Sequence, residues 1–130
     1  MKTEKKLIRS LADKQILIVD DSDRFLYAAR RQLLLRGFER VELARTSSAA
    51  RKMMFGMSID VLLIDVHLGE PGEDGLVFLC EIREAGYDRL AVAVSGDDSI
   101  GQYVRALRAG ANDYLLKGVS LDLPAEVIGL

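Results

Sequence analysis

The feature that most constrains this chain is a repeated alternation of short apolar runs with segments of helical spacing. Continuous apolar runs occupy residues 15–20 (QILIVD), 60–65 (DVLLID) and 90–95 (LAVAVS), with shorter runs at 41–44 and 114–116. These runs lack the polar alternation that is typical of a sheet with one solvated face. We therefore expect the strands of a parallel sheet that is covered on both faces.

Segments with apolar residues at helical spacing lie between these runs. The first stops at Gly37, the second starts at a cap formed by Thr46 or Ser47, and two more end near Gly86 and at Gly110. We interpret the apolar stripe of each helix as core-facing. The stripes are Phe25, Ala28, Ala29, Leu33 and Leu34; Ala49, Ala50, Met53 and Met54; Leu76, Leu79, Cys80 and Ile82; and Ile100, Tyr103, Val104 and Leu107.

This order of elements predicts one α/β domain with right-handed crossovers, a parallel sheet and helices on both faces. We assign residues 1–13 to a leader segment and residues 14–130 to the domain. Pro124 suits the first turn of a last helix, but only about two turns of chain follow it. We therefore expect the chain to be cut within that helix and the natural protein to continue.

The composition excludes several classes of protein. Hydrophobic residues make up 49% and charged residues 29%, which is typical of a globular domain. A near balance of 18 basic and 20 acidic residues gives no electrostatic reason to expect nucleic-acid binding. No apolar stretch approaches the roughly 20 residues of a membrane span, and no signal peptide is visible. We expect a cytoplasmic domain without membrane contact.

Cysteine and histidine each occur once in the chain. A single cysteine, Cys80, excludes an internal disulfide, and with only His67 beside it there is no zinc-binding pattern. Cys80 lies in an apolar run, so we expect it to be buried and unreactive.

Polar residues stand where four of the expected strands end. Asp20 and Asp21 close the run at 15–20, Asp65 closes the run at 60–65, Ser95 closes the run at 90–95, and Lys117 follows the last run. Ligands of open parallel sheets bind beyond the carboxyl ends of the strands. These side chains are therefore expected to converge on one edge of the sheet.

Three neighbouring carboxylates repel one another, and a divalent cation relieves that repulsion. Oxygen ligands that leave room for water suit Mg²⁺. Carboxylates also attack phosphorus to give an aspartyl phosphate, and phosphoryl transfer needs cations around the phosphoryl oxygens. Lys117 and the metal can supply the cations, while the Ser95 hydroxyl can donate a hydrogen bond.

With these residues in place, the sequence resembles the receiver domain of two-component response regulators over about residues 14 to 120. Five segments carry the resemblance: ILIVDDS at 16–22, VLLIDVHL at 61–68, EDGL at 73–76, AVAVSG at 91–96 and GANDYLLK at 110–117. The resemblance implies a flavodoxin-like, five-stranded doubly wound sheet with strand order 2-1-3-4-5.

The resemblance also implies a role for each residue of the set. Asp65 is the phosphoacceptor, and Lys117 contacts the phosphoryl group. Asp21 and Asp65 ligate Mg²⁺ directly together with the backbone carbonyl of His67, whereas Asp20 acts mainly through metal-bound water. The resemblance thus implies a regulatory phosphoacceptor rather than a turnover enzyme.

The resemblance further implies a switch and partners. Ser95 is the switch hydroxyl, and Tyr114 is the aromatic residue coupled to it. The phosphoryl donor is a sensor histidine kinase or a phosphotransfer protein. The face formed by the fourth helix and fifth strand, including Tyr103, is expected to be an output surface or a homodimer surface.

The chain departs from the family pattern at three places. At one of them, His67 and Asp97 stand two residues after Asp65 and Ser95, at positions that tune dephosphorylation in the family, and we hypothesise that His67 lies over the path of the attacking water. The loop between Asp65 and Asp74 is about two residues longer than usual, which bears on kinase docking. Gly118 replaces the usual proline after Lys117, so we expect a trans peptide bond there.

The same residues also admit other interpretations. Taken singly, Asp21 is a candidate helix cap, Ser95 a turn residue and Lys117 a surface residue. A haloacid-dehalogenase-like phosphohydrolase would use Asp21 as its nucleophile, but the other motifs of that family are missing. A flavodoxin-like carrier conflicts with the acids after the first strand, because they would repel a flavin phosphate. A receiver-like domain that only binds partners conflicts with the intact set of acids.

Overall fold

The computed structural model describes residues 11–68 and 74–118 of the chain. The strands are β1 (Gln15–Val19), β2 (Arg40–Ala44), β3 (Val61–Asp65), β4 (Leu90–Ser95) and β5 (Asp113–Leu116). The helices between them are α2 (Asp23–Leu35), α3 (Ser47–Gly56), α4 (Gly75–Glu84) and α5 (Ile100–Ala109). Every strand that the apolar runs predict is present, with each end within one residue of its predicted place.

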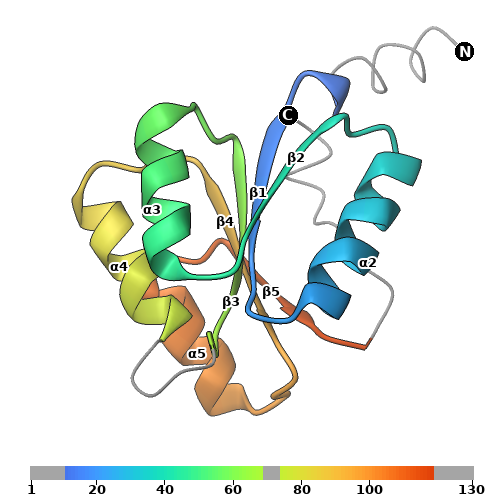
Figure 1. The fold of residues 1–130 in the computed structure, drawn as a ribbon. Helices are drawn as coiled ribbons and strands as arrows, with labels where there is room; N and C mark the ends of the chain where they lie inside the picture. Colours follow the sequence, from blue (N-terminus) through green and yellow to red (C-terminus); the bar gives the residue numbers. More distant parts are fainter. Residues whose placement is uncertain (1–10, 69–73, 119–130) are drawn as a thin grey trace, which may run out of the picture.

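The strands form one parallel sheet in the order β2-β1-β3-β4-β5, which confirms the predicted order 2-1-3-4-5. Helix α2 covers one face of the sheet, and α3, α4 and α5 cover the other (Figure 1). The doubly wound, flavodoxin-like architecture is thereby confirmed. The predicted truncated last helix, most of the leader and the middle of the long loop after Asp65 lie outside the described residues.

Alternate residues of the central strands enter two separate cores. Leu17 of β1 packs in the core beneath α3, α4 and α5, whereas Ile16 and Ile18 pack in the core beneath α2. All five residues of β3 are buried. Burial on both faces explains why the strands appear in the sequence as unbroken apolar runs. Leu11, within the predicted leader, is buried in the core beneath α2.

Polar residues cap the first turn of every described helix, and their side chains accept a hydrogen bond from a backbone N–H of that turn. The caps are Ser22, Thr46, Asp74 and Ser99. Helix α5 ends at Gly110, whose φ of 108° lies in the left-handed region that favours glycine. Within the described residues, none of the helices combines the length and the apolar character needed to cross a membrane.

The predicted burial of Cys80 is wrong, because its side chain is exposed. Helix α4 turns Leu76, Leu79 and Ile82 toward the sheet and adds Phe78 to the same buried face. At about 100° per residue, Cys80 points away from the centre of that face. Its sulfur lies 3.8 Å from an oxygen of Glu84, one turn further along the outer surface.

The apolar stripe of α5 is only partly core, contrary to its interpretation from the sequence. Ala106 is the buried residue of this helix, whereas Ile100 is 80% exposed and Tyr103 is 44% exposed. The buried face of α2 also differs from the predicted stripe, because it includes Leu26 and leaves Leu34 exposed. Helical spacing identified an apolar face in each helix, but it did not fix which residues of that face meet the sheet.

Candidate functional site

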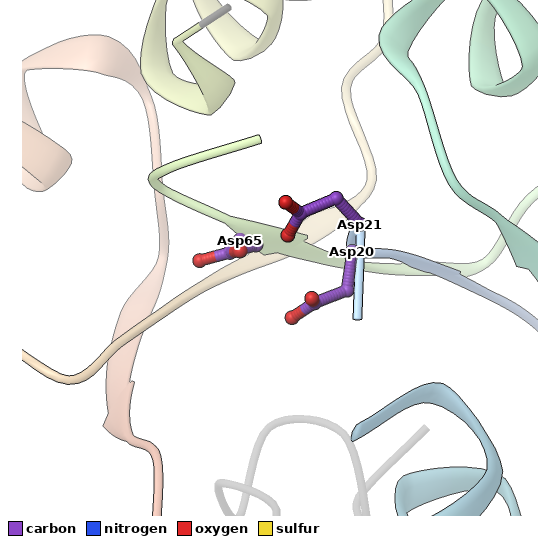
Figure 2. A group of neighbouring side chains, drawn as sticks. All are labelled: Asp20, Asp21 and Asp65. Carbon is purple, nitrogen blue, oxygen red and sulfur yellow. The ribbon is translucent and has the colours of Figure 1, made fainter. Parts of the chain in front are cut away.

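Three carboxylates meet at the carboxyl edge of the sheet. Asp20 and Asp21 follow the last residue of β1, and Asp65 is the last residue of β3. Because β1 and β3 are parallel neighbours, the structure brings these acids together. One oxygen of each side chain lies within 4.8 Å of the other two (Figure 2).

The three acids have different surroundings. Asp20 is 1% exposed and Asp65 is 4% exposed, whereas Asp21 is exposed. The Oδ1 atom of Asp20 accepts a hydrogen bond of 2.8 Å from the backbone N–H of Ser22. The Oδ1 atom of Asp65 accepts one of 3.3 Å from the backbone N–H of His67. The two buried carboxylates are therefore fixed by the backbone, and the third is exposed to solvent.

Lys117 brings a positive charge to the buried pair. It follows β5, and its backbone N–H donates to the carbonyl of Ser95 at 2.8 Å. Its Nζ lies 2.8 Å from Asp20 Oδ2 and 3.2 Å from Asp65 Oδ2. The described residues contain no cis peptide bond, so the Lys117–Gly118 bond is trans, as the missing proline predicted.

Burial and the neighbouring charge of Asp20 raise the pKa of Asp65 to about 6, although Lys117 and the His67 N–H act in the opposite direction. Burial alone would lower the pKa of Lys117, but its contacts with Asp20 and Asp65 outweigh that effect and raise it. Asp65 is therefore still mostly ionised at pH 7, and Lys117 is charged. The site holds more negative than positive charge.

Ser95 and Tyr114 are connected through Asp97. Ser95 is the buried last residue of β4, and its Oγ accepts a hydrogen bond of 3.1 Å from the backbone N–H of Asp97. The Tyr114 hydroxyl donates to the backbone carbonyl of the same Asp97. The Tyr114 ring also packs edge-on against Tyr103 of α5, with 5.9 Å between the ring centroids. A chain of contacts thus leads from the site to the exposed face of α5.

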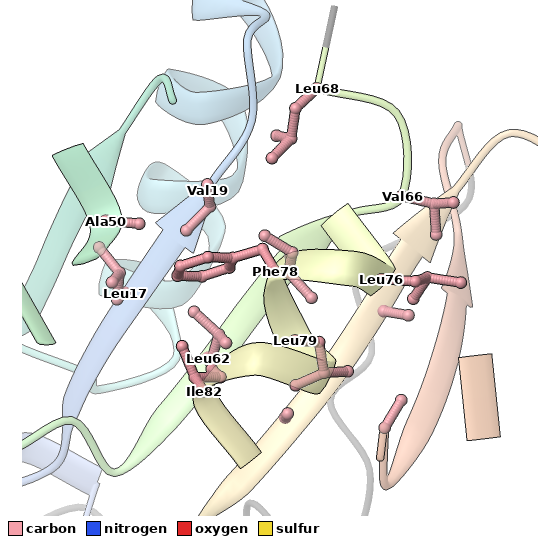
Figure 3. Close-up of a cluster of buried hydrophobic side chains, with 14 of the residues drawn as sticks. Leu17, Val19, Ala50, Leu62, Val66, Leu68, Leu76, Phe78, Leu79 and Ile82 are labelled. Atoms are coloured by element: carbon pink, nitrogen blue, oxygen red, sulfur yellow. The ribbon is translucent and has the colours of Figure 1, made fainter. Parts of the chain in front are cut away.

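Helix α4 approaches the end of β3 so closely that only glycine fits at the start of the helix. Leu76, Phe78 and Leu79 pack α4 onto the sheet (Figure 3). A Cβ atom at Gly75 would lie 1.9 Å from the carbonyl oxygen of Asp65. The Gly75 N–H donates to the carbonyl of Val66 at 2.8 Å. The start of α4 therefore holds the backbone of Asp65 and Val66 in place.

The acids fit a divalent cation. Asp20, Asp21 and Asp65 offer hard oxygen ligands within one small volume, and they outnumber the ammonium that accompanies them. The exposed position of Asp21 leaves one side open to water. This donor set suits Mg²⁺ better than a softer metal, because no sulfur or imidazole ligand belongs to the described cluster.

Sequence reasoning named the acids, Ser95, Tyr114 and Lys117, but it missed two residues that join them. It did not assign Asp97 to the link between Ser95 and Tyr114, because that link uses backbone atoms and leaves no mark in the sequence. It treated Phe25 as a core residue, whereas its ring centroid lies 4.9 Å from the Nζ of Lys117. Hydrophobic spacing can place such a ring on a helix face but cannot show a cation above it.

Comparison with known proteins gives a consistent result. The family model of the response regulator receiver domain matches residues 16–127. The chain is 35% identical over 108 residues to the response regulator MprA of Mycobacterium ulcerans, a match that covers 83% of this chain and 45% of that protein. The match to MprA of Mycobacterium tuberculosis has the same identity and covers 46% of that protein. The chain thus spans less than half the length of these curated relatives.

Solved structures of related proteins share the fold. A response regulator from Burkholderia pseudomallei, solved with a phosphorylated aspartic acid, a calcium ion and citrate, is 28% identical with a TM-score of 0.74. The match covers 84% of this chain and 62% of that one. A CheY-like receiver domain from Methanospirillum hungatei is 29% identical with a TM-score of 0.72, and the match covers 82% of each chain.

Proposed function

The chain belongs to the response regulator receiver domain family, and from this premise we propose that it accepts a phosphoryl group on Asp65 in two-component signalling. The observation that carries the proposal is the position of Asp65. It lies at the end of a buried strand and beside a second buried acid, and the Lys117 ammonium contacts both carboxylates. An ionised carboxylate beside a fixed cation has what attack on phosphorus requires.

In the proposed step, an oxygen of Asp65 forms a bond to phosphorus while the bond between phosphorus and the leaving group breaks. For a phosphohistidine donor, the imidazole nitrogen leaves with the electron pair of that bond. Lys117 keeps its protons and donates hydrogen bonds to the phosphoryl oxygens, and the Ser95 hydroxyl donates to another. The kinase or phosphotransfer protein that would supply the group belongs to the same proposal.

Mg²⁺ is the proposed cofactor. Asp21, Asp65 and the backbone carbonyl of His67 would bind it directly, and Asp20 would act mainly through bound water. When bound, the metal supplies positive charge that lessens the repulsion between the acids and the incoming phosphoryl group. The excess of carboxylates over ammonium groups at this edge supports the assignment.

The proposed output is a switch at Ser95 and Tyr114. A phosphoryl group on Asp65 adds acceptors that compete for the Ser95 hydroxyl. Because Asp97 contacts both Ser95 and Tyr114, movement of Ser95 would disturb the Tyr114 hydroxyl and the face of α5. Exposed apolar residues support this face as an output or homodimer surface; they are Ile100, Tyr103, Leu107 and Leu116.

The alternative phosphohydrolase that would use Asp21 is not supported. Asp21 is the exposed acid of the three, and the family match assigns the chain to receiver domains, which are signalling domains. A cytoplasmic location and the absence of nucleic-acid binding by this domain remain predictions from the sequence.

Mg²⁺-dependent labelling with acetyl phosphate tests the proposed function. We expect mass spectrometry to find one added phosphoryl group on the wild-type protein, and none on Asp65→Asn. Chelation of Mg²⁺ should prevent labelling. Equal labelling of Asp65→Asn and wild type would refute the assignment of the acceptor.

A further inference from the structure

The first turn of α2 is tied to the acidic site. The backbone N–H of Ser22 donates to Asp20 Oδ1 at 2.8 Å, and the Ser22 Oγ accepts from the backbone N–H of Phe25 at 3.3 Å. The Phe25 ring also packs against the core beneath α2. These contacts fix Phe25 relative to Asp20, on the side of the site opposite α4 and α5.

The side chain of Lys117 reaches the same place from the end of β5. Its Nζ lies 4.9 Å from the centroid of the Phe25 ring, within the roughly 6 Å over which an ammonium and an aromatic face attract each other. The same Nζ contacts Asp20 and Asp65. The ammonium thus has two carboxylates and one aromatic ring around it.

We propose that Phe25 is a positioning residue for phosphoryl acceptance: its ring supports the Lys117 ammonium and holds it against Asp20 and Asp65. This role rests on the proposed function of the site. A lysine side chain has four rotatable bonds and a compact charge that does not orient itself. Phosphoryl transfer depends on cations that are in place before the reaction. The ring would restrict Lys117 to that place.

The Phe25 ring is expected to contribute most to the position of Lys117 when a divalent cation is bound at the acids. The pull of Asp20 and Asp65 on Lys117 would weaken once a divalent cation at the site offsets their charge, whereas the attraction of an uncharged ring would remain. In the reaction with acetyl phosphate, an Asp65 oxygen bonds to phosphorus, the phosphorus–oxygen bond to acetate breaks, and acetate leaves with its electron pair. Lys117 keeps its protons and only stabilises charge on the phosphoryl oxygens.

Three variants of the full chain separate the aromatic contact from simple packing. Phe25→Leu keeps an apolar side chain but removes the ring, and Phe25→Tyr keeps the ring. Phe55→Leu is the matched control, because Phe55 is 85% exposed on α3, away from the site. The measurements are the initial rate of acetyl phosphate labelling with Mg²⁺ and the NMR shift of the Lys117 Hε protons.

We expect Phe25→Leu to lower the labelling rate about fivefold, the effect of losing one cation–π contact. Phe25→Tyr and Phe55→Leu should stay within about twofold of wild type. The ring should shield the Lys117 Hε protons in wild type and Phe25→Tyr, and this upfield shift should disappear in Phe25→Leu.

Three results would overturn the proposal. They are an unchanged labelling rate in Phe25→Leu, an equal loss of rate in Phe25→Leu and Phe25→Tyr, or unshielded Lys117 Hε protons in wild type. The last measurement needs no variant, so it decides the matter even if Phe25→Leu does not fold. If the wild-type protein takes no label, the proposed function of the site fails. If the wild-type protein is labelled normally and any of these three results is found, only the role of Phe25 is rejected.

Discussion

The two ends of β3 place similar acids in opposite circumstances. At the amino end, Asp60 Oδ2 accepts a hydrogen bond of 2.8 Å from the backbone N–H of Gln15, and Asp60 Oδ1 pairs with Arg89. At the carboxyl end, Asp65 shares one lysine with Asp20 and lies near Asp21. Asp60 has a cation of its own, whereas Asp65 must share its cation with Asp20.

The difference separates an acid that holds the structure together, Asp60, from the acid for which we propose reactivity, Asp65. Asp60 joins the starts of β1 and β3 to the segment before β4, and its charge is matched by Arg89. Asp65 is held where its charge is only partly matched, and burial raises its pKa. An acid with unmatched charge can still bind a metal or attack phosphorus, whereas a matched acid contributes to stability.

Removal of Lys117 and of Arg89, the cations at the two ends of β3, should give the largest difference in labelling rate. Lys117→Met should lower the rate of acetyl phosphate labelling about 10²-fold, because it removes one preorganised donor to the phosphoryl oxygens. Arg89→Met should leave the rate within about twofold of wild type. Initial rates from intact-protein mass spectrometry measure both. A similar loss in the two variants would mean that the ends of β3 do not differ in function.

Removal of the acid at each end should change stability in opposite directions. Asp60→Ala should lower the free energy of unfolding by about 2 kcal/mol, because the Gln15 N–H loses its acceptor and Arg89 its partner. Asp65→Asn should raise it by about 1 kcal/mol, after allowance for solvent screening, because it removes a charge from an overcrowded site. Urea denaturation without Mg²⁺ measures both changes. Destabilisation by both variants would contradict the distinction.

Mg²⁺ should stabilise the protein by binding at the carboxyl end of β3 and not at its amino end. At a concentration about ten times the dissociation constant, binding to the native state raises the free energy of unfolding by about 1.4 kcal/mol. Asp21→Asn should lose most of this gain, and Asp60→Asn should keep it. Thermal unfolding with and without Mg²⁺ provides the measurement, and a gain that survives Asp21→Asn would remove that residue from the metal site.

The smallest expected effect is the pH dependence that Asp65 adds in the absence of metal. A native pKa of about 6, above the ordinary value of 3.8, means that the native state binds a proton more tightly than the unfolded chain. The stability that comes from this protonation is complete below about pH 4 and is lost as the pH rises through 6. The stability of wild type minus that of Asp65→Asn should therefore decrease over this range, by about 1 kcal/mol. A constant difference from pH 4 to 7 would contradict the raised pKa.

Much of the fold and the composition of the site could be predicted from the sequence. Strands buried on both faces appear as unbroken apolar runs, so their ends, and the polar residues there, could be placed within a residue. The topology that brings Asp20, Asp65 and Lys117 to one edge follows from parallel strands alone. These predictions depend only on where the strands begin and end and on their order, and the apolar runs in the sequence indicate the strand ends directly.

The predictions that failed depend on how helices rotate against the sheet. Cys80 and Leu34 belong to apolar stripes but face outward, and Ile100 is mostly exposed. An angular error of one residue moves a side chain about 100° around its helix, and spacing does not exclude such an error. The links through Asp97 and Phe25 were missed for another reason, because they depend on tertiary contacts between distant segments.

The ion pair between Lys117 and Asp65 joins residues 52 positions apart, from strands that pair only through β4. Contacts between distant segments cost loop-closure entropy and tend to form late in folding. The outermost strand must therefore dock before the acidic edge receives its lysine. During refolding, the contacts of Lys117 with Asp20 and Asp65 should thus return more slowly than the helical signal, so a chain whose β5 has not yet docked would hold its acids without their lysine.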